Sequence, residues 1–117
     1  MKTIILDTDF ILNCVKWKID LKNELKRICD FSFEICVIDK TIDELKGKQN
    51  EAIALNFIKD FRIIQTSRDK PVDELILALK DVIAATQDKE LKEKLKKGRF
   101  PVITIRQKKF LMIQDVL

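Results

Sequence analysis

Apolar residues in this 117-residue chain form short continuous runs that alternate with longer segments of helical periodicity. The runs lie at residues 4–6, 35–38, 63–64, 82–85 and 101–105. Short apolar runs without a helical period are typical of strands buried on both faces, as in a parallel sheet. We therefore predict five strands at these positions.

The segments between the runs carry helix signals. Asp20 is a predicted N-cap, followed by Leu21, Leu25 and Ile28 at helical spacing, and Gly98 is a predicted C-cap. The predicted helices cover residues 10–18, 21–28, 41–45, 49–61, 71–79 and 89–97. Since no Asn-Gly hairpin signal occurs, the pattern indicates one α/β domain over residues 1–117, a three-layer α/β/α fold with a central parallel sheet of about five strands. Residues 106–117 form a basic, then apolar, C-terminal tail of unassigned conformation.

Composition narrows the class of protein. Hydrophobic residues make up 46% and charged residues 36% of the chain, as in a globular protein with a core. No apolar run approaches the roughly 20 residues of a membrane span, and the amino terminus lacks signal-peptide zones, so we expect a cytoplasmic protein with no membrane partner. Cys14, Cys29 and Cys36 are expected to be buried free thiols.

The chain contains no histidine and no tyrosine. This excludes imidazole acid–base catalysis, Ser/His/Asp triads and histidine-ligated metals. Any hydrolysis must therefore use carboxylates and a metal ion. The net charge of +4 and the pI near 9.0 suit a polyanionic partner.

Four acids follow the predicted strands or open the helices next to them: Asp7, Glu44, Asp73 and Asp88. Because the carboxyl ends of parallel strands share one edge of a sheet, we expect these four to converge there. Each acid also has a purely structural explanation. Asp7, like Asp9, could cap the helix beginning near residue 10, and Asp88 could cap the helix at 89–97. Thr41 with Glu44 fits a capping box, and Asp73 suits the first turn of its helix.

Bringing carboxylates together needs compensation, since two like charges 4 Å apart repel by ~4 kcal/mol at an effective dielectric near 20. Mg²⁺ or Mn²⁺ bound by oxygen ligands supplies it. Such ions also promote phosphodiester hydrolysis without histidine.

Four segments together resemble the acidic motifs of PIN domains, in order and in spacing. They are Asp7-Thr8, Thr41-Ile42-Asp43-Glu44-Leu45, Val72-Asp73-Glu74-Leu75-Ile76-Leu77 and Ala85-Thr86-Gln87-Asp88-Lys89-Glu90-Leu91. The ending, with residues 101–103 and 106–111, is more similar to archaeal PIN proteins related to the eukaryotic small-subunit processome endonuclease than to VapC toxins.

The resemblance implies a Mg²⁺- or Mn²⁺-dependent endoribonuclease that acts on RNA, with rRNA processing in ribosome biogenesis as its task. Asp7, Glu44, Asp73 and Asp88 would hold one or two ions, and Thr86 would orient ligands or water. Many relatives have an aspartate pair where this chain has Asp73-Glu74, so Glu74 is a further candidate ligand. Self-association in the family leads us to expect a homodimer. The alternatives are a catalytically weak RNA-binding assembly factor, a VapC-like toxin and, more distantly, a phosphatase or small-nucleotide hydrolase.

Basic residues concentrate in the last third of the chain. The candidate RNA-binding residues are Lys92, Lys96, Lys97, Arg99, Arg106, Lys108 and Lys109. Phosphate contacts by such residues give affinity without sequence specificity. The alternative for residues 89–97 is a solvated helix face balanced by its acids, and Trp17 is expected to be partly buried core rather than a base-stacking platform.

Overall fold

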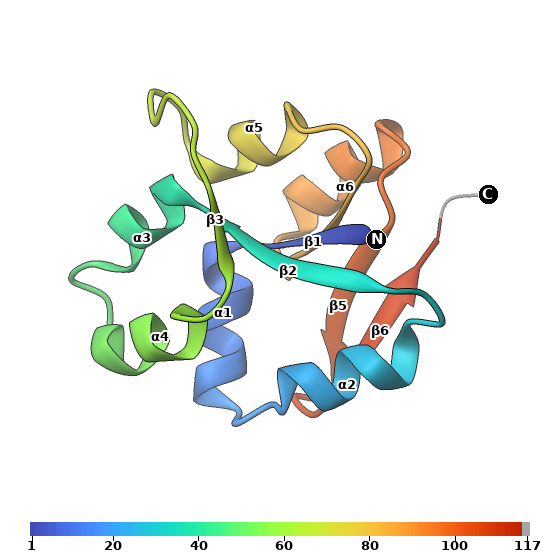
Figure 1. Ribbon diagram of the computed structural model, residues 1–117, viewed down its shortest axis with the longest axis horizontal. Helices are drawn as coiled ribbons and strands as arrows, with labels where there is room; N and C mark the ends of the chain where they lie inside the picture. The colour runs from blue at the N-terminus through green and yellow to red at the C-terminus, as the bar shows by residue number, and fades with distance from the viewer. Residues whose placement is uncertain (116–117) are drawn as a thin grey trace.

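Six strands form one sheet in the middle of the computed structural model, which describes residues 1–115 (Figure 1). In chain order they are β1 (Lys2–Leu6), β2 (Phe33–Ile38), β3 (Arg62–Ile64), β4 (Val82–Ala85), β5 (Val102–Arg106) and β6 (Phe110–Gln114). Their order in space is β3-β2-β1-β4-β5-β6, and neighbours are parallel except for the β5–β6 pair. The last two residues of the predicted C-terminal tail, 116–117, lie outside the described residues.

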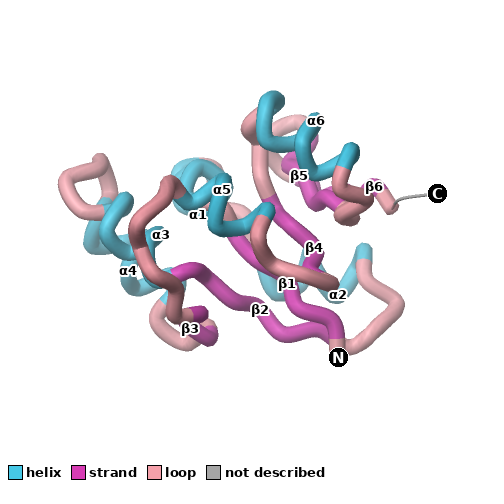
Figure 2. The backbone as a smooth tube through the Cα atoms, turned by 90° about the horizontal axis from the view of Figure 1, so that it is seen from above, coloured by secondary structure: helices cyan, strands magenta, loops and turns pink. Residues whose placement is uncertain are grey.

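Helices cover both faces of this sheet and confirm the predicted three-layer α/β fold (Figures 1 and 2). They are α1 (Thr8–Lys16), α2 (Leu21–Ile28), α3 (Asp39–Leu45), α4 (Glu51–Ile58), α5 (Val72–Leu77) and α6 (Lys89–Lys97). The first core cluster joins one sheet face to α1, α2 and α4, and the second joins the other face to α5 and α6. No helix in residues 1–115 is long and apolar enough to cross a membrane.

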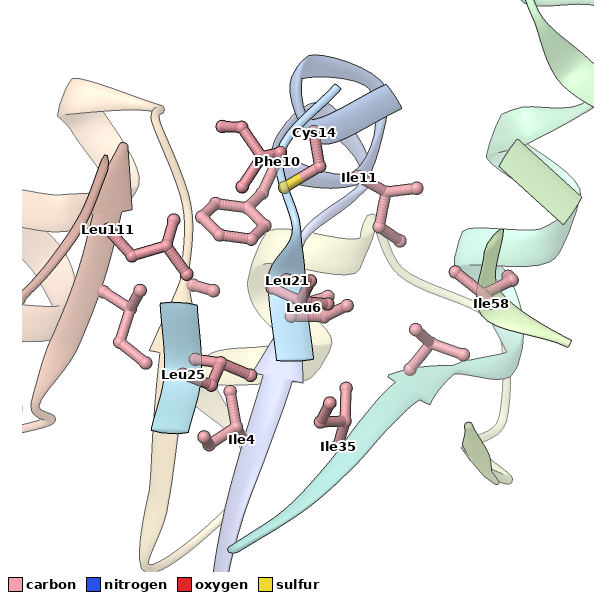
Figure 3. Packing of buried hydrophobic residues seen from close by; sticks show 14 of the residues in the cluster. Ile4, Leu6, Phe10, Ile11, Cys14, Leu21, Leu25, Ile35, Ile58 and Leu111 are labelled. Atoms are coloured by element: carbon pink, nitrogen blue, oxygen red, sulfur yellow. The ribbon is translucent and has the colours of Figure 1, made fainter. Parts of the chain in front are cut away.

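The central strand β1 shows why a continuous apolar run is needed. Ile4 and Leu6 point into the cluster under α1 and α2 (Figure 3). Ile5 points into the cluster under α5 and α6, and all three side chains are fully buried. Burying each side chain stabilises the fold by roughly 1.5–3 kcal/mol. A polar residue at any of these three positions would lose this contribution, so the buried half of the strand is a continuous apolar run.

The strand order reverses direction beside β1. From β1 the chain moves outward through β2 to β3, and it then returns to the other side of β1 to form β4. Ligands in open α/β sheets bind at the carboxyl ends of strands flanking such a switch point. The segments that follow β1 and β4 are therefore the ones placed to form a site.

Strand β6 was not predicted, and its antiparallel pairing corrects the expectation of an all-parallel sheet. The turn after Arg106 has positive φ at Gln107 (54°) and Lys108 (55°), and the Lys109 N–H donates to the Arg106 carbonyl at 3.0 Å. Two central residues with positive φ are the mark of a type I′ hairpin turn, which Asn-Gly usually forms. The sequence therefore lacks the residues by which the hairpin could have been found.

Helix α2 holds the outer edge of β6. The Leu111 N–H donates to Glu24 Oε1 at 2.8 Å, and the Arg27 guanidinium donates to the Leu111 carbonyl at 2.7 Å. These two bonds occupy the outward backbone groups that another strand would otherwise use. Glu24 and Arg27 also pair with each other at 2.9 Å, so one ion pair closes this part of the edge.

Two helices begin earlier than predicted. Helix α1 begins at Thr8 rather than residue 10, because the Asp7 carboxylate accepts the Thr8 N–H and acts as N-cap. Helix α3 begins at Asp39, so Thr41 lies inside it with a buried, unpartnered hydroxyl. The predicted capping box between Thr41 and Glu44 is therefore wrong, and the Glu44 carboxylate is available for other contacts.

Candidate functional site

A small hollow of about 230 Å³ opens where β1 and β4 end. It is lined by Asp7, Thr8, Asp9, Glu44, Val72, Asp73 and Asp88. All four acids predicted to converge line it, although they come from four separate segments of the chain. The parallel sheet brings them together, since the segments after β1, β2, β3 and β4 all emerge at one edge.

Asp7 is the most buried of these acids, with 8% of its surface exposed. Its Oδ1 accepts the Thr8 N–H at 2.8 Å, and its Oδ2 accepts the Thr86 hydroxyl at 2.7 Å. Burial raises the pKa of Asp7 to about 6, and the charges of Asp9 and Asp88 act in the same direction, whereas the two hydrogen bonds oppose it. Asp7 thus caps α1 through Oδ1, as the capping interpretation predicted, while its Oδ2 is held by Thr86.

Glu44 reaches the hollow through Thr8. The Thr8 hydroxyl donates to Glu44 Oε1 at 2.8 Å and links the start of α1 to the end of α3. Thr8 is buried, so this hydroxyl is fixed in direction. Sequence reasoning gave Thr8 no role of its own, although its position directly after a strand-ending acid is a signal that could have been used.

Thr86 joins Asp7 to Asp88. Its fully buried hydroxyl donates to Asp7 Oδ2 and accepts the Asp88 N–H at 3.1 Å. Asp88 caps α6 by accepting the Leu91 N–H at 3.1 Å, as the sequence predicted, and it remains exposed. A continuous set of hydrogen bonds therefore runs from Glu44 through Thr8, Asp7 and Thr86 to Asp88.

The remaining acids divide into those inside and outside the hollow. Asp73, half-buried in the first turn of α5, lines it as predicted. Asp9 also lines it, although the sequence suggested only capping, and its spacing of two residues from Asp7 is the signal that was missed. Glu74, a predicted ligand, is exposed and is not among the lining residues.

The donor set has the chemistry of a hard-cation site. It offers only carboxylate and hydroxyl oxygens, which Mg²⁺ and Mn²⁺ prefer, and a buried carboxylate with a raised pKa gains most from a nearby cation. Within residues 1–115, no three acidic or cysteine side chains are already grouped so that they could hold one ion. Side chains such as exposed Asp9 and Asp88 must therefore rotate to complete a coordination shell.

Asp39 shows that a strand-ending acid need not belong to the site. It follows β2 as Asp7 follows β1, but it accepts the Thr66 N–H and hydroxyl and pairs with Arg68 at 3.1 Å. Burial would raise its pKa, but the hydrogen bonds from Thr66, Arg68 and Lys40 outweigh burial and lower it to about 2. Asp39 thus anchors the segment that leads from β3 to α5 and its Asp73.

The predicted RNA-binding residues do not form one surface. Lys92, Lys96 and Arg106 line one groove between α6 and β5. Arg99 lies at the opposite edge of the sheet, in a larger hollow of about 900 Å³ that also includes Asp81 and the amino terminus. That hollow is larger than the acidic one, but it lacks converging carboxylates and does not carry the chemistry of the site.

The other predicted basic residues and the cysteines lie elsewhere. Lys97 is exposed at the end of α6, while Lys108 and Lys109 lie on the hairpin turn, with the Lys108 amine 5.9 Å from the ring centre of Trp17. Trp17 is half-buried against the first core cluster, as expected. All three cysteines are free, but Cys29 is only half-buried.

Comparisons with known proteins agree with the resemblance described above. The sequence model of the PIN-like domain family matches residues 4–108. The chain is 36% identical over 128 aligned residues to Ribonuclease VapC4 of Methanocaldococcus jannaschii, with 97% of each chain covered. Its fold is similar to that in the structure of the PIN domain endonuclease Utp24, with a TM-score of 0.81, 28% identity, and 98% of this chain and 95% of that chain covered. The family and the fold predicted from the acidic motifs are thereby confirmed.

Proposed function

The chain belongs to the PIN-like domain family, and we propose that it is a divalent-metal-dependent endoribonuclease that hydrolyses RNA phosphodiester bonds at the acidic hollow. Similarity to a ribonuclease and to a PIN domain endonuclease supports this activity. The observation that carries the proposal is Asp7, a carboxylate buried next to other acids with its pKa raised to about 6. Such a group is poorly placed for packing alone and well placed to bind a cation.

We assign ion binding to Asp7, Asp9, Glu44, Asp73 and Asp88. A bound Mg²⁺ or Mn²⁺ would polarise the phosphoryl group and lower the pKa of a water molecule. Oxygen ligands held in place lose little freedom when the ion binds. Glu74 has no assigned contact, because it is exposed outside the hollow.

Two threonines act as positioning residues in this proposal. The Thr86 hydroxyl directs Asp7 Oδ2 and fixes the Asp88 backbone, and the Thr8 hydroxyl directs Glu44. Thr86 is fully buried, so substrate and bulk water do not compete for its bonds. The two threonines therefore keep Asp7 and Glu44 oriented before the ion arrives, whereas the exposed Asp9 and Asp88 side chains rotate when it binds.

The test is cleavage of an end-labelled structured fragment of ribosomal RNA in Mn²⁺, in Mg²⁺ and in EDTA. Asp88→Asn is the diagnostic variant, because Asn preserves the N-cap of α6 while removing the charge. Asp81→Asn is the matched control: Asp81 is exposed at the opposite edge, and its φ of 55° is one that Asn tolerates. We expect cleavage only with metal, retained in Asp81→Asn and lost in Asp88→Asn. Cleavage in EDTA, or equal cleavage by Asp88→Asn, would contradict the proposal.

The similarity to Ribonuclease VapC4 supports a second candidate, a toxin ribonuclease. A toxin should arrest growth when it is expressed in a bacterial host, and Asp88→Asn should relieve the arrest. An enzyme dedicated to ribosomal RNA processing should instead cut one precursor site and leave growth unaffected. Mapping the 5′ ends of cellular RNA after expression separates the two.

A further inference from the structure

A groove of about 340 Å³ lies between α6 and the β5–β6 hairpin, apart from the acidic hollow. Four cations line it: Lys89, Lys92 and Lys96 from α6, and Arg106 from the end of β5. Among the described residues, Glu93 is its one acidic lining residue, so the described lining carries a net charge of +3. We refer to it as the α6–β5 groove.

The four cations are close enough to repel one another. Burial lowers the pKa of Lys92, and the charges of Arg106, Lys96 and Lys89 lower it further. Within residues 1–115, none of the four forms an ion pair with an acid. A concentration of unpaired positive charge in a hollow favours a polyanion.

A buried hydroxyl in the same groove also lacks a partner. Thr104 lines the groove with 5% of its surface exposed, and within the described residues its Oγ1 forms no hydrogen bond. It lies on the α6 face of the sheet, because its neighbours Ile103 and Ile105 pack into the cluster on the other face. Buried polar groups usually have partners, so this hydroxyl is an exception, and an oxygen from outside the chain could bond to it once the side chains that cover it move.

Exposed apolar side chains extend the groove onto β6. Residues directly opposite in an antiparallel pair share a face, and the register pairs Arg106 with Phe110 and Thr104 with Met112. Phe110 and Met112 are 42% and 43% exposed, on the face that carries the groove. An aromatic ring next to a row of cations is typical of surfaces that bind single-stranded nucleic acid.

The groove also begins beside the acidic hollow. Asp88 lines the hollow, Lys89 follows it directly in the groove, and the charge of Asp88 acts on Lys92. A strand with one phosphate at the hollow can therefore place neighbouring phosphates in the groove.

From these observations we propose that the α6–β5 groove binds the phosphates of single-stranded RNA beside the cleaved bond, with Phe110 stacking on an unpaired base. The proposal rests on the proposed cleavage of RNA. The groove proposal makes the RNA-binding surface smaller than the sequence predicted. Lys97 and Arg99, which were predicted from sequence alone, are not among the groove's lining residues.

The first test measures binding of a fluorescein-labelled single-stranded 12-nucleotide RNA in EDTA over a range of salt concentrations. The groove variant carries Lys92→Gln, Lys96→Gln and Arg106→Gln. The matched control carries Lys22→Gln, Lys26→Gln and Lys59→Gln, which removes the same charge from exposed positions on α2 and at the end of α4.

We expect the groove variant to bind at least tenfold more weakly. Its slope of log K against log salt should fall by about 2, since each phosphate contact to a single strand contributes about 0.7. The control should bind within about twofold of the wild type. Equal weakening in both variants would overturn the proposal, because affinity would then follow net charge rather than the groove.

The second test concerns the ring. Phe110→Leu should weaken binding of the single strand about tenfold, Phe110→Trp should preserve it, and neither should alter binding of a duplex of the same sequence. Because Phe110 is partly exposed, circular dichroism should show all three proteins equally folded. Equal affinity of the Leu and Trp variants for the single strand would exclude stacking.

Cleavage by the wild type in Mn²⁺ separates failure of this proposal from failure of the proposed function. Groove-dependent binding in EDTA without cleavage in Mn²⁺ would support RNA binding by the groove and contradict the proposed nuclease activity. Cleavage by the wild type, together with unchanged RNA binding by the groove variant, would support the nuclease activity and overturn the groove proposal. Absence of any RNA binding by the wild type would also overturn the groove proposal and would direct attention to an acidic protein partner.

Discussion

Replacing Asp7 with Asn should stabilise the protein in EDTA at neutral pH. The carboxylate is 8% exposed, its pKa is raised to about 6, and ionising it in the folded state is therefore unfavourable. Asn has nearly the same shape. Its carbonyl can accept the Thr8 N–H, and its amide can donate to the Thr86 hydroxyl in place of the bond that this hydroxyl now donates.

The magnitude follows from linkage. A carboxyl whose pKa rises from near 4 in the unfolded chain to about 6 in the fold binds more protons when folded. The contribution of Asp7 to the free energy of unfolding is therefore highest below pH 4, falls as the pH rises from about 4 to 6, and stays about 3 kcal/mol lower above that. Asp7→Asn removes this pH-dependent loss of stability. The net gain is smaller by the free energy that the rearranged hydrogen bond to Thr86 costs.

The assay is urea denaturation of both proteins in EDTA at several values between pH 4 and pH 8, with Asp81→Asn as an exposed control. The variant should gain up to about 3 kcal/mol over the wild type between pH 4 and pH 8, and the control should gain nothing. A saturating divalent cation at 100 times its Kd should stabilise only the wild type and Asp81→Asn, by about 2.7 kcal/mol. Parallel pH curves for wild type and Asp7→Asn would refute the reasoning, because they would show that Asp7 ionises without cost.

Three further predictions follow from single contacts. Asp39→Asn should have the opposite pH dependence. Because the pKa of Asp39 is lowered to about 2, its charge contributes up to about 2 kcal/mol above pH 4, and this contribution is lost as the pH falls from about 4 to 2. In urea the variant should therefore be less stable than the wild type at pH 7 and equally stable near pH 2. Thr86→Val should destabilise the fold by about 2 kcal/mol at pH 8, since it leaves the ionised Asp7 without its hydroxyl donor. Thermal melts should show this loss shrinking at pH 4 as Asp7 protonates, and Thr86→Ser should melt like the wild type at both values. Replacing Gln107-Lys108 with Asn-Gly should raise stability in urea by about 1 kcal/mol because both positions have positive φ; no gain would indicate that the Lys108 contact with Trp17 offsets the relieved strain.

The inner parallel strands β1, β2, β4 and β5 could be predicted from the sequence because their apolar runs are buried on both faces. β4 (Val82–Ala85) was predicted without error, since all four residues are apolar and polar residues flank them. The same logic placed Asp7 and Asp88 at one edge, because the polarity of a parallel sheet alone determines which ends of its strands meet.

Strand β6 could not be predicted, for two physical reasons. Its turn uses Gln107 and Lys108 in a conformation that usually requires Asn or Gly. Its exposed positions, Phe110 and Met112, are as apolar as its buried Leu111, so the alternation that reveals a half-buried strand is absent. The proposed RNA groove accounts for this second feature, because a stacking surface requires apolar residues on the exposed face.

Glu44 shows how a valid local motif can mislead. Thr41 and Glu44 have the spacing of a capping box, but the helix starts at Asp39, two residues before the predicted start. The long-range bond from Thr8 to Glu44 spans 36 residues and has no local signature. Local rules identify an acid near a helix start, whereas its partner depends on which strands are neighbours.

Asp7 and Asp39 have the same local sequence context, but the fold gives them opposite chemistry. Each follows a buried apolar strand, and each accepts a backbone N–H from the next residue. Asp39 also receives the hydroxyl of Thr66 and the guanidinium of Arg68, so its charge is neutralised within the chain. Within residues 1–115, Asp7 receives one hydroxyl and no cation, and it has two acidic neighbours. The difference lies in the β3–α5 segment, which supplies Arg68 to one acid and brings Asp73 to the hollow of the other. Pairing Asp39 within the chain while leaving Asp7 without a cationic partner among the described residues is what the proposed cation binding at the hollow requires.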